Sequence, residues 1–263
     1  MTQTATLTAT AGTRESVPAW RRVLGIARSE GKRLRRPTFA GVGLLAVLFF
    51  AFMATFSTFA TAEMMAEMGG SLPMFGAIGD VTAADGIVAG VGMAADIVGL
   101  IMLALWAAAV SSDYSSGWVR LAVAAEPRRW RLIAGKLVTL TGFTLLATAL
   151  ATVVSMVVAP MAAAATGVDT AAWGTDLLPI AAEAWFNLTV VALVWGSIGF
   201  VVASVTRSAI AAIAGGIGYL MVVEGMLTAL AEDLTTYLPG SILDAVIAGG
   251  HSSIAYVTAL GLA

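Results

Sequence analysis

The sequence predicts an all-α protein that crosses a membrane several times. Hydrophobic residues make up 59% of the 263 positions and charged residues only 11%, whereas a soluble domain carries about 25% charged residues. This number of charges is too small to cover a water-facing surface. We therefore expect most of the surface to meet lipid. Backbone groups in lipid must be satisfied within each segment, which favours helices. We predict a single transmembrane domain over residues 14–263, preceded by a Thr- and Ala-rich, disordered tail over 1–13.

Apolar runs define the predicted spans. A crossing helix needs about 20 apolar residues, because the hydrocarbon layer is about 30 Å thick. Five runs meet this length: 38–60, 86–110, 135–159, 180–206 and 208–231. A sixth run, 254–263, gives only about 15 Å of helix. We therefore predict six transmembrane helices, with the sixth apparently truncated and the natural chain continuing beyond it.

The basic residues orient these spans. All 14 Lys and Arg residues lie before the first span, between the second and third, or between the fourth and fifth. Cytoplasmic loops retain Lys and Arg during membrane insertion. These segments and the N-terminus are therefore predicted to be cytoplasmic, and the predicted outer loops contain no Lys or Arg.

Residues 15–36 are predicted to form an amphipathic helix in the cytoplasmic interface. Trp20, Val23, Leu24 and Ala27 recur at helical spacing, with arginines and lysines among them. Such a helix places its cations near anionic headgroups. A basic anchor that only sets the topology is the competing interpretation.

The sequence shows no signature of a catalytic site. It has no cysteine, and its one histidine, His251, lies in a predicted outer loop. A phosphate-binding loop needs a Gly five residues before its Gly-Lys pair and a Ser or Thr after it. Trp130 and Leu137 occupy those places around Gly135-Lys136. We expect no enzymatic activity, metal site or cofactor in this chain, and no nucleic-acid partner.

The longest predicted cytoplasmic loop runs from Ser111 to Arg131, with helix breaks at Gly117 and Pro127. An acid is followed by Gly, an aliphatic-Arg pair, Pro, Arg, and a Lys that opens the next span. This order resembles the coupling region of the ABC type-2 transporter permeases. The matching residues are Asp113, Gly117, Val119, Arg120, Pro127, Arg129 and Lys136. Composition alone is equally typical of an ordinary positive-inside loop.

Other segments resemble the same family. Residues 27–35 are similar to a Ser-Glu-x-x-Lys-Leu-Arg stretch before the first span of many actinobacterial members, with the lysine shifted by one place to Lys32. Residues 219–230 resemble the fifth span, and Leu238-Pro239-Gly240 resembles the outer turn. The family usually has Glu in place of Asp113 and often Thr in place of Trp118.

The resemblance implies a permease subunit of an ABC exporter in a bacterial, multi-pass cytoplasmic (inner) membrane, with six helices and an interfacial elbow helix at 15–36. It implies pairing with a second copy of itself or a related permease. A separate ATP-binding cassette ATPase subunit would bind ATP and Mg. The residues expected to couple to that ATPase are Glu30, Lys32, Asp113, Tyr114, Gly117, Trp118, Arg120, Pro127, Arg128 and Arg129.

Hydroxyl groups form one face of the predicted third span. Thr141, Thr144, Thr148, Thr152 and Ser155 are spaced three or four residues apart. This stripe either lines a path for a polar or amphipathic substrate, or packs helices together and bonds its own backbone. We favour packing for most of these residues.

Asp96 and Glu224 are predicted to lie in the outer half of the second and fifth spans. An ionised Asp at mid-membrane costs about 2.5–3.5 kcal/mol on insertion scales, so it needs a partner, water or a proton. We assign Asp96 to a water-filled outer vestibule on the substrate path. The role of Glu224 is left open, and solvation at the headgroups is preferred for Glu183. An ion-coupled secondary transporter that uses Asp96 and Glu224, or a non-transporting membrane scaffold, is the alternative function.

Overall fold

The structure is a computed structural model. It describes residues 18–34, 37–62, 71–72, 76–77, 81–126, 128–224, 226–227, 238–249 and 255–263. Among these residues, four helices are long and apolar enough to cross a membrane, as expected of a helical membrane protein. They are α2 (Val42–Ala60), α4 (Ala89–Ser115), α6 (Arg129–Thr166) and α7 (Leu177–Thr206).

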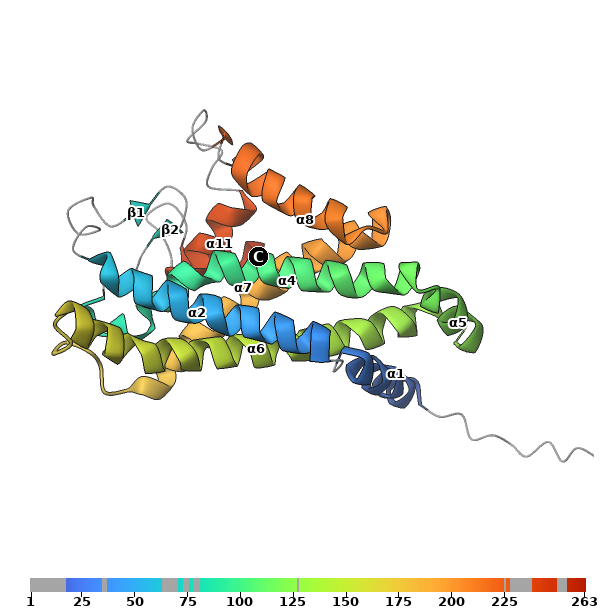
Figure 1. Cartoon of the computed structure of the whole chain (residues 1–263), viewed down its shortest axis with the longest axis horizontal. Coiled ribbons are helices and arrows are strands. Elements are labelled where there is room, and N and C mark those ends of the chain that lie inside the picture. Colours follow the sequence, from blue (N-terminus) through green and yellow to red (C-terminus); the bar gives the residue numbers. More distant parts are fainter. Residues whose placement is uncertain are drawn as a thin grey trace, which may run out of the picture.

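Helix α4 is the central element of the bundle (Figure 1). It packs against α2, α6, α7 and α8 (Ala209–Gly218). Its contact with α7 depends on small residues, since a Cβ at Gly199 would collide with the carbonyl oxygen of Leu103. The side chain of Trp195 on α7 lies against Gly99 of α4, where an added Cβ would collide with the indole ring. Helix α4 is therefore in direct contact with most of the described bundle.

The four long helices confirm that the runs 38–60, 86–110, 135–159 and 180–206 are apolar helices. A π-helical turn, η1 (Pro37–Gly41), leads into α2, and a 3-10 turn, η2 (Gly86–Val88), leads into α4. Helix α6 extends past the predicted span at both ends and has 38 residues. This corresponds to about 57 Å of helix.

The last two predicted spans are described only in part. The run 208–231 is helical through α8 and the π-helical η3 (Tyr219–Glu224), and residues 225 and 228–237 lie outside the described residues. Helices α11 (Pro239–Ile247) and α12 (Tyr256–Leu262) follow. A count of six crossings therefore stays a prediction. The predicted tail, 1–13, also lies outside the described residues.

The opposite ends of the bundle differ in structure. Helices α1 (Ala19–Leu34) and α5 (Trp118–Ala125) lie at one end, and strands β1 (Ser71–Leu72) and β2 (Gly76–Ala77) lie at the other (Figure 1). The strands form a short antiparallel ladder that the all-α prediction did not include. The described Lys and Arg residues lie on α1, around α5 and the start of α6, and in the turn after α7.

The segment predicted as the loop from Ser111 to Arg131 is mostly helical, which corrects that part of the prediction. Helix α4 continues to Ser115, α5 begins after Gly117, and α6 begins at Arg129. The polar residues here end the apolar run, but a helix satisfies its own backbone hydrogen bonds outside lipid as well. Gly117 has a left-handed φ of 69°, which confirms the predicted break there. Pro127 lies outside the described residues.

Candidate functional site

Helix α1 lies directly against the start of α6. Its inward side carries Ala27 and Glu30, which are buried, beside the half-buried Ile26. A Cβ at Gly135 would lie 2.5 Å from Ile26 Cγ2, so only glycine allows this approach. Thr139 Oγ1 donates a hydrogen bond of 3.0 Å to the carbonyl oxygen of Ala27. The exposed side of α1 carries Trp20 and cations, as an interfacial helix would, but its position in a membrane stays a prediction.

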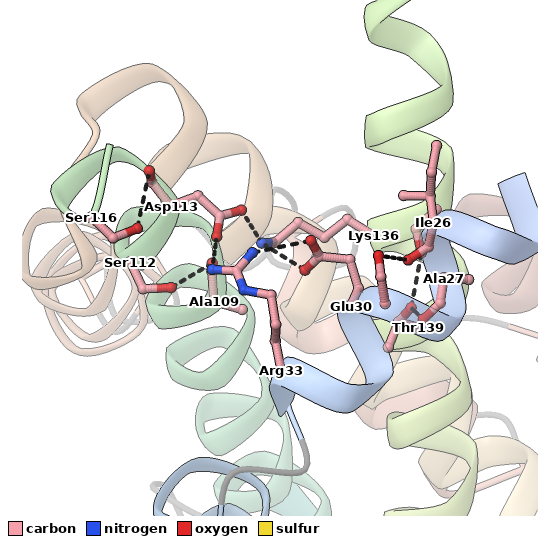
Figure 2. Close-up of polar contacts among 12 residues, drawn as sticks. Ile26, Ala27, Glu30, Arg33, Ala109, Ser112, Asp113, Ser116, Lys136 and Thr139 are labelled. Atoms are coloured by element: carbon pink, nitrogen blue, oxygen red, sulfur yellow. Dashed lines mark hydrogen bonds and ion pairs between the residues drawn. The ribbon is translucent and has the colours of Figure 1, made fainter. Parts of the chain in front are cut away.

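Four charged side chains from three helices meet where α1 ends (Figure 2). We call Glu30, Arg33, Asp113 and Lys136 the ionic cluster. Arg33 donates hydrogen bonds to Glu30 Oε1 at 3.1 Å and to Asp113 Oδ1 at 2.9 Å. Lys136 donates to Asp113 Oδ2 and lies 3.7 Å from Glu30 Oε2. The cluster therefore ties α1 to the end of α4 and the start of α6.

The ionic cluster is largely removed from solvent and is electrically balanced. The side chains of Glu30, Asp113 and Lys136 are 10–13% exposed. Each cation contacts both carboxylates, so deletion of one partner would leave a poorly solvated charge. Removal of one partner from such a site leaves an unbalanced charge, and this costs more free energy than the loss of an exposed ion pair. The arrangement favours one fixed geometry of the three helix ends.

The ionic cluster also contacts α5. The Arg33 guanidinium lies 4.6 Å from the ring centroid of Trp118, a cation–π contact that reaches the first residue of α5. Helix α5 otherwise makes few contacts with the bundle, and its Arg120 and Leu121, which is 66% exposed, are both accessible to solvent. A short helix that offers apolar and basic groups is a suitable surface for a protein partner.

A second group of charges holds the corner between α5 and α6. Arg131 Nη1 donates to both oxygens of Glu126 at 3.2 Å, and Arg22 of α1 lies 3.9 Å from Glu126 Oε2. Desolvation of its carboxyl opposes ionisation of Glu126. The hydrogen bond from the Arg128 N–H and the positive charges of Arg131 and Arg22 outweigh this effect of desolvation. They keep the pKa of Glu126 below its ordinary value. Helix α1 is thus joined to this corner at two places.

The structure brings together only part of the predicted coupling set. Glu30 and Asp113 are in the ionic cluster, and Trp118 stacks beneath it. Lys32 is exposed and takes no part in the cluster, while Arg33, which the sequence analysis did not select, is central to it. The available signal was the spacing, because Arg33 lies three residues after Glu30 on the same helical face.

The remaining predicted coupling residues surround this corner. Tyr114 is exposed and stacks with Arg207, whose guanidinium lies 5.7 Å from its ring centroid. Arg128 and Arg129 are exposed at the start of α6. These side chains lie at the same end as α5 and can reach a molecule that covers it.

The hydroxyl stripe of α6 faces its neighbours in the bundle. Thr144, Thr148, Thr152 and Ser155 are buried, whereas Thr141 is half-buried. The first three donate hydrogen bonds to carbonyl oxygens one turn earlier in α6. Three contacts also cross between helices: Trp106 Nε1 donates to Thr144 at 3.1 Å, Thr148 and Thr189 hydroxyls are 2.8 Å apart, and Thr55 donates to Ser155 at 2.9 Å. These contacts agree with the packing interpretation.

Three acids gather near the end of α4 that lies away from the ionic cluster. Asp96, Glu224 and Asp244 lie close enough for their charges to interact. Glu224 Oε1 accepts a hydrogen bond of 3.0 Å from the Ser241 N–H, in the first turn of α11. A carboxylate at a helix N-terminus is stabilised there by the backbone dipoles, which gives Glu224 a structural explanation. Within the described residues, no group of three His, Cys, Asp or Glu side chains could hold a metal ion.

Comparisons of this chain with models of protein families, with curated proteins and with solved structures gave no match.

Proposed function

We propose that the chain is the membrane-spanning permease subunit of an ATP-binding cassette exporter in a bacterial cytoplasmic membrane. A separate ATPase subunit would bind and hydrolyse ATP with Mg. A second copy of the chain, or a related permease, would complete the substrate path. The observation that carries this proposal is the ionic cluster, which joins α1, α4 and α6 and reaches α5 through Arg33 and Trp118.

The mechanism follows from these connections. An ATPase that binds α5 would push on the corner between α4 and α6, and the ionic cluster would carry α1 with it. Because α4 packs against α2, α7 and α8, displacement of its end would shift the helices around it. Helix α1, with Trp20 exposed, would keep this corner at the level of the lipid headgroups.

Purification of the full-length chain from its native membranes, in mild detergent, tests this proposal. We expect a vanadate-sensitive ATPase to co-purify, and vesicles containing the complex to export substrate only with ATP. Leu121→Asp, which changes the exposed face of α5, should remove the ATPase. Ala171→Asp, a change at an exposed position in the turn between α6 and α7, should retain it.

An ion-coupled secondary transporter is the second candidate, favoured by the proximity of Asp96, Glu224 and Asp244. It predicts that the purified chain alone moves substrate along an ion gradient, without ATP, and that Asp96→Asn abolishes this transport. That result would contradict the exporter. ATPase recruitment without any ATP-dependent transport would instead indicate a membrane scaffold.

A further inference from the structure

A cavity of about 570 Å³ lies beneath α5 at the basic end of the bundle, a volume that falls within the range of about 300–1,000 Å³ typical of ligand sites. Its walls come from α1, α4, α5, α6 and α7. Apolar side chains form much of this lining, among them Val110, Val119, Leu132, Ile133 and Phe200. The cavity is therefore suited to a ligand that has an apolar part.

The polar part of the lining has an excess of positive charge. Arg120 of α5, Arg129 of α6 and Arg207 after α7 all line the cavity. In the part of the chain that the structure describes, none of these three arginines forms an ion pair with a carboxylate. The two acids that line the same cavity, Glu30 and Asp113, are neutralised by cations of the ionic cluster.

The backbone at Arg207 is unusual as well. Arg207 has a φ of 56°, and no other non-glycine residue in the described ranges has a positive φ. A left-handed conformation costs about 1–2 kcal/mol for a residue with a side chain. It places Arg207 at the end of α7, where its side chain lines the cavity and stacks on Tyr114.

We propose that this cavity binds the headgroup phosphate of an anionic phospholipid from the cytoplasmic leaflet. Arginine forks pair well with phosphate oxygens, and the apolar lining accommodates the start of an acyl chain. Basic pockets between transmembrane helices on the cytoplasmic side are suited to anionic lipid headgroups. A soluble acidic segment would gain little from the apolar walls, so charge and lining together favour a lipid. Since the phosphate would bridge Arg120, Arg129 and Arg207, it would hold α5 against the turn after α7.

Native mass spectrometry of the detergent-purified full-length chain tests the proposal with phosphatidylglycerol and phosphatidylcholine. Both lipids carry the phosphate, but the choline of phosphatidylcholine adds a cation that the three arginines repel. We therefore expect about tenfold tighter binding of phosphatidylglycerol, a difference of about 1.4 kcal/mol. Arg120→Gln combined with Arg207→Asn should remove this preference, since asparagine tolerates the left-handed conformation. Ala122→Trp, which fills the cavity but keeps every charge, should remove it too. Arg28→Gln, an exposed cation of α1 outside the cavity lining, is the matched control and should retain it.

Further arms separate the ligand sources. Glycerophosphoglycerol, the headgroup without chains, should bind at least tenfold more weakly than the intact lipid, and equal binding would show a site for soluble phosphate compounds instead. An octaglutamate peptide that binds in the cavity more tightly than the lipid would also overturn the proposal. So would equal binding of both phospholipids, or a loss caused by Arg28→Gln as large as that caused by the cavity variants. Thermal unfolding of each variant verifies that it is folded.

Discussion

Asp113 and Asp96 lie on the same helix, about 25 Å apart at about 1.5 Å per residue, and their surroundings are opposite. Asp113 is held by Arg33 and Lys136. The charged groups that interact with Asp96 include Glu224, and Asp96 in turn acts on Asp244. One carboxylate is a structural partner of cations, and the other adds to a region of like charge.

The distribution of basic residues explains this difference. The described Lys and Arg residues lie at the end of the bundle that carries α1 and α5, so an acid at that end finds a cation from a neighbouring helix. Acids at the other end must be stabilised by backbone N–H groups, as Glu224 is by Ser241, or by water or protons. The same type of side chain on one helix therefore has cationic partners at one end and acidic neighbours at the other.

Labelling of single cysteines tests which of the two ends of the bundle faces the cytoplasm. The expected effect is all-or-none. Leu121→Cys and Ala171→Cys each place one thiol on an exposed position of a chain that has no cysteine. We expect a membrane-impermeant maleimide to label the thiol at 171 in intact cells, and the thiol at 121 only after permeabilisation. The reverse pattern would invert the predicted topology.

Amide substitution of the two aspartates should have unequal effects on stability. Asp113→Asn leaves Lys136 and Arg33 with one carboxylate partner, Glu30. It should cost about 2–3 kcal/mol, between the values for exposed and buried ion pairs. Asp96→Asn relieves repulsion among the acids and should leave stability unchanged or raise it by up to about 1 kcal/mol. Thermal unfolding in detergent measures the stability of both variants. Equal losses of stability would contradict the difference between the surroundings of Asp113 and Asp96.

The contribution of one cation of the ionic cluster, Arg33, can be compared with that of its neighbour Lys32. Arg33→Gln should cost about 1 kcal/mol, because Arg33 contacts two acids but is partly solvated. Lys32→Gln, next to it on the exposed side of α1, should stay within about 0.5 kcal/mol of the parent chain. Thermal unfolding curves of the two variants measure both losses of stability. A larger loss for Lys32→Gln than for Arg33→Gln would contradict the assignment of Arg33 to the ionic cluster.

The smallest expected effect concerns the hydroxyl stripe. Thr148→Val removes the contact with Thr189 and should cost about 0.6 kcal/mol. A double-mutant cycle with Thr189→Val isolates the interaction between the two hydroxyls. A coupling energy near zero, together with altered substrate export, would favour the substrate-path interpretation over packing.

Much of the fold follows from the sequence because apolar length and helix formation are linked in lipid. The runs at 86–110 and 180–206 could be located within a few residues. Helix ends such as Arg129 could not, since a helix does not need lipid in order to continue. The ionic cluster was only partly predictable: Asp113 and Lys136 stood out by pattern, but the choice of Arg33 over Lys32 depends on which face of α1 meets α6. Gly135, which sets that face, has no sequence signal that separates it from a flexible glycine.

The length of α6 has a consequence for how force would cross the membrane. Its 38 residues far exceed what one crossing needs. The helix is uninterrupted from Arg129 to Pro160, where the proline lacks the N–H of an i to i−4 hydrogen bond. A displacement applied at Lys136 would thus travel through a stiff rod to the far leaflet and be absorbed at Pro160. In this protein, a movement begun at the ionic cluster would become a bend of α6 at the opposite end of the bundle.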